Sequence, residues 1–230
     1  MKPKTALFLT VCLLVVPLAS VASGDDIAGL WSYESFDGPK HGVKPLVGLF
    51  LFHDGWFIHQ AMHGSEPMEL QLTDAHIGKY QLKSGGVVRF DVETGIVVTP
   101  TEDTLLAGRS NTSHEVGYKR SGENLFLSFA NGASEKLVKV PTTKTTLIAL
   151  DRGMLALTDE HFVLVTAPDD GWLAGSGRYE REGNVLRLEA LRWFIVQGDE
   201  AHYAADETFE ATFNGEMLQL PDGPSFHVAK

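Results

Sequence analysis

The sequence predicts an all-β fold of antiparallel strands, organised as barrels from two tandem repeats. Three observations support this: short apolar runs bounded by turn residues, alternation of apolar and polar residues within the runs, and an internal repeat. The runs are about five to eight residues long and rich in Val, Leu, Phe and Tyr. Because glycine takes the positive φ of tight hairpin turns and Asn or Asp tolerates it, six residue pairs predict turns. These pairs are Asp37-Gly38, Asp54-Gly55, Asn131-Gly132, Asp170-Gly171, Asn214-Gly215 and Asp222-Gly223.

The internal repeat consists of four blocks that recur in the same order. The longest block, Leu49–His59, aligns without a gap on Met154–Leu164. The others place Gly78–Tyr80 on Gly177–Tyr179, Val87–Asp91 on Val185–Glu189, and Gly122–Leu127 on Gly215–Leu220. We therefore expect a first β repeat over residues 27–140 and a second, shorter one over residues 145–230. The two repeats either form separate barrels or share one extended core.

Alternation indicates which strand faces are buried. In Lys79–Lys83, the apolar residues Tyr80 and Leu82 fall on one face and the polar residues on the other, as in a strand with one wet face. The hairpin Leu46–Met62 differs, because apolar residues run continuously through both of its strands. We expect this hairpin to be covered on both faces. One face would line a cavity, and the opposite face would contact the other repeat.

The N-terminus resembles a secretory signal peptide over residues 1–23, with Lys2 and Lys4 before a short apolar run and small residues at its end. We therefore expect an exported protein, periplasmic or extracellular, with no membrane span after cleavage. Cys12, the one cysteine, lies inside this segment, so the mature chain has no disulfide. The net charge of −11 and the scattered Lys and Arg residues argue against nucleic acid as a partner.

Three short motifs carry a family resemblance. Gly29-Leu-Trp31 opens the first predicted strand, Phe50–His59 forms an aromatic-rich hairpin, and Gly78-Lys-Tyr80 opens a later strand. In this order they resemble the lipocalin-like domains of bacterial proteins. The resemblance implies a closed antiparallel barrel with room for one small apolar ligand, in which Trp31 plugs the core near the closed end.

The first repeat holds the predicted ligand-binding residues, because it is the bulkier and more aromatic copy. A cavity needs apolar walls and a few polar groups that orient the guest. The candidates are Phe50, Phe52, Trp56, Phe57, His59 and Tyr80. Leu155 and Leu164 replace Phe50 and His59 in the second repeat, so the shared scaffold does not require these two.

No metal, cofactor or catalytic residue is predicted. His59 and His63 share a strand face, but four residues at ~3.3 Å each separate them by about 13 Å, too far for one ion. Histidines of this kind are more often found at rims and turns, and a metal site would need a partner from another strand. A haem pocket beside His59 is a further alternative. No nucleophile elbow, metalloprotease helix or phosphate loop is present.

The leading hypothesis is an exported, soluble β-barrel protein that binds a small apolar or amphipathic ligand without catalysis. One alternative is a lipocalin-like enzyme of the isomerase or hydratase type, with His59 or Tyr80 as acid or base. A cavity that holds a histidine and a carboxylate would favour the enzyme. The other alternative is an envelope protein-interaction module. The sequence leaves the ligand and the oligomeric state open.

Overall fold

The computed structural model describes residues 27–39, 42–64, 72–100, 105–109, 112–167, 171–197, 200–221 and 223–229. Every regular element in these ranges is a β-strand, which confirms the all-β prediction. No helix in the described part of the chain is long and apolar enough to span a membrane. The predicted signal peptide, with Cys12, lies outside the described residues.

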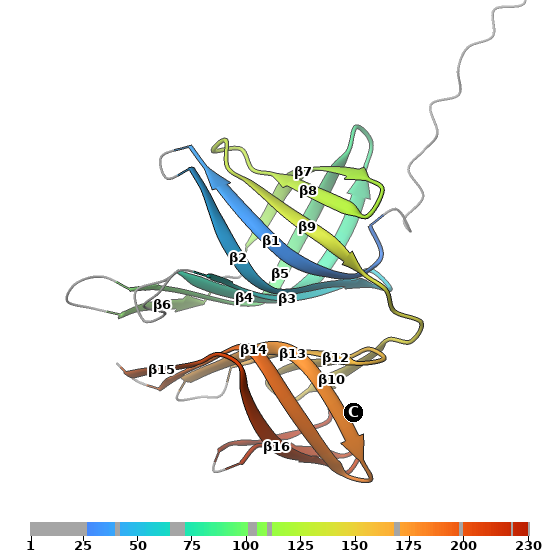
Figure 1. Ribbon diagram of the computed structural model, residues 1–230, viewed down its shortest axis with the longest axis vertical. Helices are drawn as coiled ribbons and strands as arrows, with labels where there is room; N and C mark the ends of the chain where they lie inside the picture. Colours follow the sequence, from blue (N-terminus) through green and yellow to red (C-terminus); the bar gives the residue numbers. More distant parts are fainter. Residues whose placement is uncertain are drawn as a thin grey trace, which may run out of the picture.

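The first nine strands form one antiparallel sheet that closes into a barrel (Figure 1). They are β1 (Gly29–Gly38), β2 (Gly42–His53), β3 (Trp56–His63), β4 (Thr73–Lys83), β5 (Val87–Pro100), β6 (Leu105–Arg109), β7 (Ser113–Ser121), β8 (Asn124–Ser128) and β9 (Ser134–Val140). The strand order is β4-β3-β2-β1-β9-β8-β7-β5, and the pairing of β4 with β5 closes the ring. β6 extends the sheet beyond the barrel by pairing with β5 alone.

The second nine strands repeat this plan. They are β10 (Thr146–Leu150), β11 (Gly153–Leu157), β12 (His161–Thr166), β13 (Gly171–Glu182), β14 (Val185–Gln197), β15 (Glu200–Ala204), β16 (Glu207–Phe213), β17 (Met217–Gln219) and β18 (Ser225–His227). Their order is β10-β11-β12-β13-β14-β16-β17-β18, and β15 extends β14 as β6 extends β5. A single bridge between Leu150 and Val228 joins the two ends, so this barrel is nearly closed.

Three of the six predicted turns are confirmed. Asp54 and Gly55 have φ of 49° and 77° and join β2 to β3 as a two-residue loop. Gly132 and Gly215 also have positive φ, between β8 and β9 and between β16 and β17. The prediction at Asp37-Gly38 is wrong, because both residues pair with β2 and end β1. Asp170 and Asp222 lie outside the described residues.

Gly78 and Gly177 mark matching bulges in the two barrels. The register of β4 against β5 shifts immediately before Gly78, and that of β13 against β14 immediately before Gly177. A Cβ added to Gly78 would lie 2.1 Å from the carbonyl oxygen of Asp91, and one on Gly177 would lie 2.0 Å from that of Glu189. Backbone approaches each glycine too closely for a side chain, which explains why the repeated motif keeps glycine.

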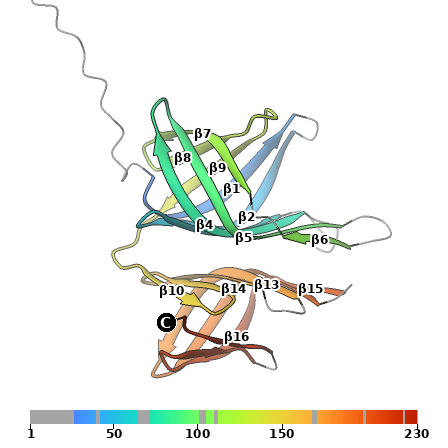
Figure 2. The same ribbon diagram turned by 180° about the vertical axis from the view of Figure 1, so that it is seen from behind.

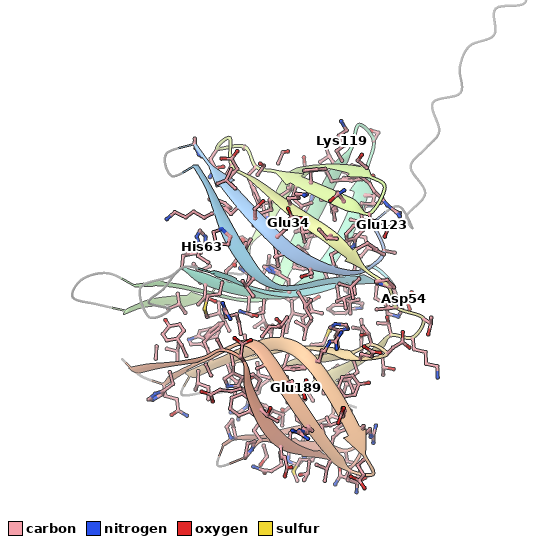
Figure 3. The ribbon with its side chains drawn as sticks, viewed as in Figure 1. Glu34, Asp54, His63, Lys119, Glu123 and Glu189 are labelled. Carbon is pink, nitrogen blue, oxygen red and sulfur yellow. The ribbon has the colours of Figure 1, made fainter. Side chains whose placement is uncertain are left out.

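The two barrels stack on one another through facing sheets (Figure 2). Each barrel has its own core, and a third apolar layer joins the two barrels. Side chains fill the space between the facing sheets, where β2, β3 and β4 contact β12, β13 and β14 (Figure 3). This layer includes Leu49, Leu51, Ile58, Ile77 and Ile96 from the first barrel and Met154, Ala156, Val163, Val165 and Phe194 from the second. The sequence left open whether the repeats form separate barrels or share one extended core. The structure shows separate barrels that share an outer apolar layer.

The hairpin of β2 and β3 is covered on both faces, as predicted. Phe50, Phe52 and Phe57 point into the first barrel, whereas Leu51 and Ile58 point towards the second. Gln60 also faces the second barrel, where its Oε1 accepts a hydrogen bond from Ser176 at 2.8 Å. A single hairpin thus forms a wall of the barrel interior and part of the contact between barrels.

Trp31 fills one end of the first barrel. Its side chain is fully buried, and its indole Nε1 donates a hydrogen bond to the carbonyl oxygen of Ile27 at 2.8 Å. The ammonium of Lys139 lies 4.5 Å from the ring centroid and the guanidinium carbon of Arg120 lies 5.8 Å from it. Trp31 is therefore a core residue stabilised by two neighbouring cations, as the family resemblance implied.

Candidate functional site

The candidate site lies inside the first barrel, where β3 and β4 run side by side. His59 on β3 pairs directly with His76 on β4. Asp74 precedes His76 by two residues, and alternate residues of a strand share a face, so both point into the barrel. Tyr33 reaches the same place from β1, two residues beyond Trp31. Strand register thus brings together four polar side chains from three strands, β1, β3 and β4.

A chain of short contacts links these side chains. The Tyr33 hydroxyl lies 3.0 Å from Nδ1 of His59, and Nε2 of His59 lies 2.8 Å from Nδ1 of His76. Oδ2 of Asp74 is 3.8 Å from the same His76 nitrogen. Either Tyr33 donates to His59 and His59 to His76, or His76 donates to His59 and His59 to Tyr33. The network therefore supports two tautomeric arrangements of the histidine pair.

A small, partly open pocket adjoins this network. Its volume is about 70 Å³. It is lined by Tyr33, Phe50, Phe57, His59, Asp74, His76, Phe90, Val92, His114, Leu127, Phe129 and Glu135. Since a water molecule occupies about 30 Å³, the space suits an ion with water, or the end of a small molecule. It is far too small for a haem, since even drug-sized ligands need pockets of about 300 Å³ or more.

Two carboxyl groups in the pocket have strongly altered acidity. Burial raises the pKa of Asp74 to about 7, against a smaller opposing effect from its own backbone N–H. Burial, and then the negative charge of Asp74, raise the pKa of Glu135 to about 8. The Asp74 side chain keeps 28% of its surface, so the size of its shift depends on how much water the pocket admits. Near neutral pH both groups can hold or release a proton.

The pocket histidines are neutral at the same pH. Burial, and then the charge of His114, lower the pKa of His76 to about 4. Burial lowers the pKa of His59 well below its usual value, with smaller contributions from His76 and His114. Both imidazoles therefore offer a lone pair as well as an N–H.

The structure brings together only some of the predicted ligand-binding residues. Phe50, Phe57 and His59 line the pocket, and the Phe50 ring stacks on His59 with 4.7 Å between centroids. Phe52 is buried in the core of the barrel, with the half-buried Tyr80 ring edge-on against it at 5.1 Å. Neither of these two lines the pocket.

Trp56 lies elsewhere. It packs against the apolar layer between the barrels, with the ammonium of Lys79 5.0 Å from its ring centroid. His59 is only 6% exposed, so the expectation of a rim or turn position is wrong for this histidine.

Sequence reasoning missed Tyr33, Asp74, His76 and Glu135. They lie on β1, β4 and β9, and only the strand register places them beside His59. A difference between the two copies of the repeat could have identified two of these residues. His76 corresponds to Gly175 and Asp74 to Leu173, when Gly78 is aligned on Gly177.

The second barrel fills the equivalent space with apolar side chains. Leu164 on β12 pairs with Gly175 on β13, where the first barrel has His59 and His76. The Trp193 ring covers Gly175 so closely that a Cβ there would lie 2.0 Å from it. Trp193 corresponds to Gly95, which pairs with His76 in the first barrel. The polar site therefore belongs to one copy of the repeat.

His59, Asp74 and His76 are also the group best arranged to hold a metal ion. One donor atom from each lies within 4.8 Å of the others.

In comparisons with known proteins, no protein-family model matches the sequence, and neither a curated protein nor a solved structure matches the chain. The functional argument therefore rests on the geometry of the first barrel.

Proposed function

We propose that the protein is an exported, non-catalytic binding protein of the lipocalin-like type, whose first barrel receives one end of a small amphipathic ligand. The pocket beside His59 and His76 is the observation that carries this proposal. The second barrel, filled by Trp193, serves as structural support.

The build of the first barrel supports the lipocalin-like part of the proposal. Gly29-Leu-Trp31 opens its first strand, and Trp31 is buried at one end of it. In lipocalins an arginine from late in the chain packs on this tryptophan, and the Arg120 guanidinium carbon, 5.8 Å from the Trp31 ring centroid, supports the likeness. Of the remaining interior, the pocket beside His59 is the part that a ligand can enter, since apolar side chains fill the core.

The lining supports an amphipathic ligand in preference to a purely apolar one. Phe50, Phe57 and Phe90 form apolar walls, while Asp74 and Glu135 supply hydrogen-bonding groups. The small volume admits only a few non-hydrogen atoms, so the rest of a larger ligand lies outside the pocket. A polar end that donates hydrogen bonds suits the two carboxyl groups best.

Native mass spectrometry of protein purified from its own source tests the proposal. We expect a bound small molecule that is released on denaturation. Isothermal titration with octylamine, octanol and octanoate probes the head group, and octylamine should bind most tightly because it meets two carboxyl groups. Absence of any bound molecule together with no octylamine binding contradicts the proposal. N-terminal sequencing of the exported form tests cleavage near Ala22 or Ser23.

The repeat itself supplies a matched variant. The double substitution His76→Gly and Gly95→Trp gives the first barrel the pair found at Gly175 and Trp193. Because the second barrel accommodates this pair, the variant should fold while losing octylamine binding. His53→Thr, which copies Thr158 at the hairpin turn, is the control that should bind normally.

One observation favours an enzyme as the second candidate. The pocket contains histidines together with a carboxyl group whose pKa is about 7, a value suited to acid or base catalysis near neutral pH. His59, His76 and Asp74 would then act on the substrate, and Tyr80 would not, because it does not line the pocket. Turnover of a bound molecule that is lost in Asp74→Asn, while binding remains, would establish the enzyme.

A further inference from the structure

We propose that His59, His76 and Asp74 form a binding site for one divalent first-row transition-metal ion. The three donors come from two neighbouring strands, and all lie within 4.8 Å of one another. Two imidazoles and one carboxylate suit such ions, whereas Mg²⁺ and Ca²⁺ prefer sets of oxygen ligands. The proposal goes beyond organic ligand binding and does not depend on it.

The spacing of the two imidazole nitrogens is already close to that of neighbouring metal ligands. Two ligands at about 2.05 Å from one ion lie about 2.9 Å apart at right angles and about 3.3 Å apart in the tetrahedral arrangement of Zn²⁺. Nε2 of His59 and Nδ1 of His76 are 2.8 Å apart. Oδ2 of Asp74, now 3.8 Å from the His76 nitrogen, needs to approach by about 1 Å to reach the same spacing. We expect a rotation of the Asp74 side chain, which is 28% exposed, to supply that movement.

The surroundings of His59 hold its ring in a metal-binding orientation. When Nε2 binds the ion, Nδ1–H donates to the Tyr33 hydroxyl oxygen at 3.0 Å. Metal-binding histidines usually make such an outer hydrogen bond, which fixes the tautomer and the ring plane. The stacked Phe50 ring restricts the imidazole from the side. His59 is therefore positioned before any ion arrives.

The carboxyl groups and the size of the pocket also favour a cation, which would bind as the carboxyl protons are released. Asp74 and Glu135 both line it, and the described lining residues include no Lys or Arg to balance them. A volume of about 70 Å³ accommodates an ion and one or two water molecules, which would complete its coordination.

The second barrel provides an internal control. The positions of His59, Asp74 and His76 are taken there by Leu164, Leu173 and Gly175, none of which offers a side-chain donor. We therefore expect one ion per chain, and the same scaffold without the donors should bind none.

Titration of untagged, chelator-treated protein with Zn²⁺, Cu²⁺ and Mg²⁺ tests the site. Zn²⁺ and Cu²⁺ should bind with a stoichiometry of one, Cu²⁺ more tightly, while Mg²⁺ should not bind. His59→Leu, which copies Leu164, should abolish Zn²⁺ binding. Tyr33→Phe should weaken it about 10- to 100-fold through loss of the outer hydrogen bond. His53→Thr, outside the site, should leave it unchanged.

Two results would overturn the proposal: no Zn²⁺ binding by the wild-type protein, or equal binding by His59→Leu. Thermal unfolding in chelator establishes that each variant is folded. X-ray absorption of the Zn²⁺ complex of the wild-type protein gives an independent answer, because it should show two imidazole ligands. An absence of Zn²⁺ binding would not change the octylamine result, so the two proposals can be contradicted independently.

Discussion

The interiors of the two barrels differ most at one pair of facing positions on neighbouring strands. In the first barrel the pair is His76 and Gly95, and in the second it is Gly175 and Trp193. The bulky side chain thus changes strand, from an imidazole on β4 to an indole on β14. Where the indole lies, the barrel is filled. Where the imidazole lies, a pocket with polar lining remains. The same scaffold supports a solid core or a site, depending on which strand carries the ring.

Removal of the Trp193 indole should have the largest effect on stability, and it tests directly whether this side chain fills the second barrel. Trp193 is 5% exposed and stacks on Phe209 with 5.0 Å between ring centroids. Trp193→Ala should destabilise the protein by about 3–5 kcal/mol, because it leaves a large cavity. Urea denaturation followed by far-ultraviolet circular dichroism measures the loss. A loss below about 1 kcal/mol would show that Trp193 does not fill the second barrel.

The matching bulges test whether the two copies obey the same backbone constraint. Gly78→Ala and Gly177→Ala each place a Cβ about 2 Å from a backbone carbonyl oxygen. Each should cost about 1–3 kcal/mol in the free energy of unfolding, and the two costs should be similar. Gly117→Ala is the control, because a Cβ there would lie 3.6 Å or more from its neighbours and should cost less. Gly215 is unsuitable as a control because its φ is positive. Unequal costs at the two bulges would argue against their equivalence.

The contact between barrels can be tested through the buried Gln60–Ser176 pair. Ser176→Ala removes the hydrogen bond to Oε1 of Gln60, which is fully buried. The expected cost is about 1–2 kcal/mol, because a buried acceptor is left without a donor. Adding Gln60→Met should recover stability, since both polar partners are then gone. No recovery in thermal denaturation would mean that the pair does not act as a unit.

A pH dependence that belongs to the first barrel gives a further test of the comparison. The folded pKa values of Asp74 and Glu135, about 7 and 8, exceed the usual values of 3.8 and 4.5. The folded state therefore holds more protons, and stability should fall as pH rises from about 4 to 8. The lowered pKa of His76 acts oppositely, with stability lost as pH falls from 6.5 to about 4. Between pH 6.5 and 8 only the carboxyl contribution remains.

Chemical denaturation at several pH values in this window measures the effect. Each carboxyl contributes less than about 1.4 kcal/mol per pH unit. Glu135→Gln should flatten the profile, and an unchanged slope would contradict the assignment. The titratable groups that face one another here are Tyr33, His59, Asp74, His76, His114 and Glu135.

The sequence predicted the scaffold well because its signals are local or repeated. Alternation within Leu49–Phe52 assigned two residues to each face, and the structure places Phe50 and Phe52 inside the barrel as expected. The site was harder, because the partner of His59 lies 17 residues away and depends on strand register. Comparing the repeats at Gly175 would have singled out His76. The pocket's small volume depends on rotamers of several Phe rings, which no linear pattern records.

The apolar layer between the barrels also has an evolutionary consequence. Leu51, Ile58 and Ile77 are shielded from water only by the other copy of the repeat. Either copy produced alone would expose a contiguous apolar patch and be prone to aggregate. Once such residues had accumulated on both facing sheets, loss of either copy would have become harmful. The duplication is thereby entrenched, and the interior of either copy could change while that copy remained indispensable.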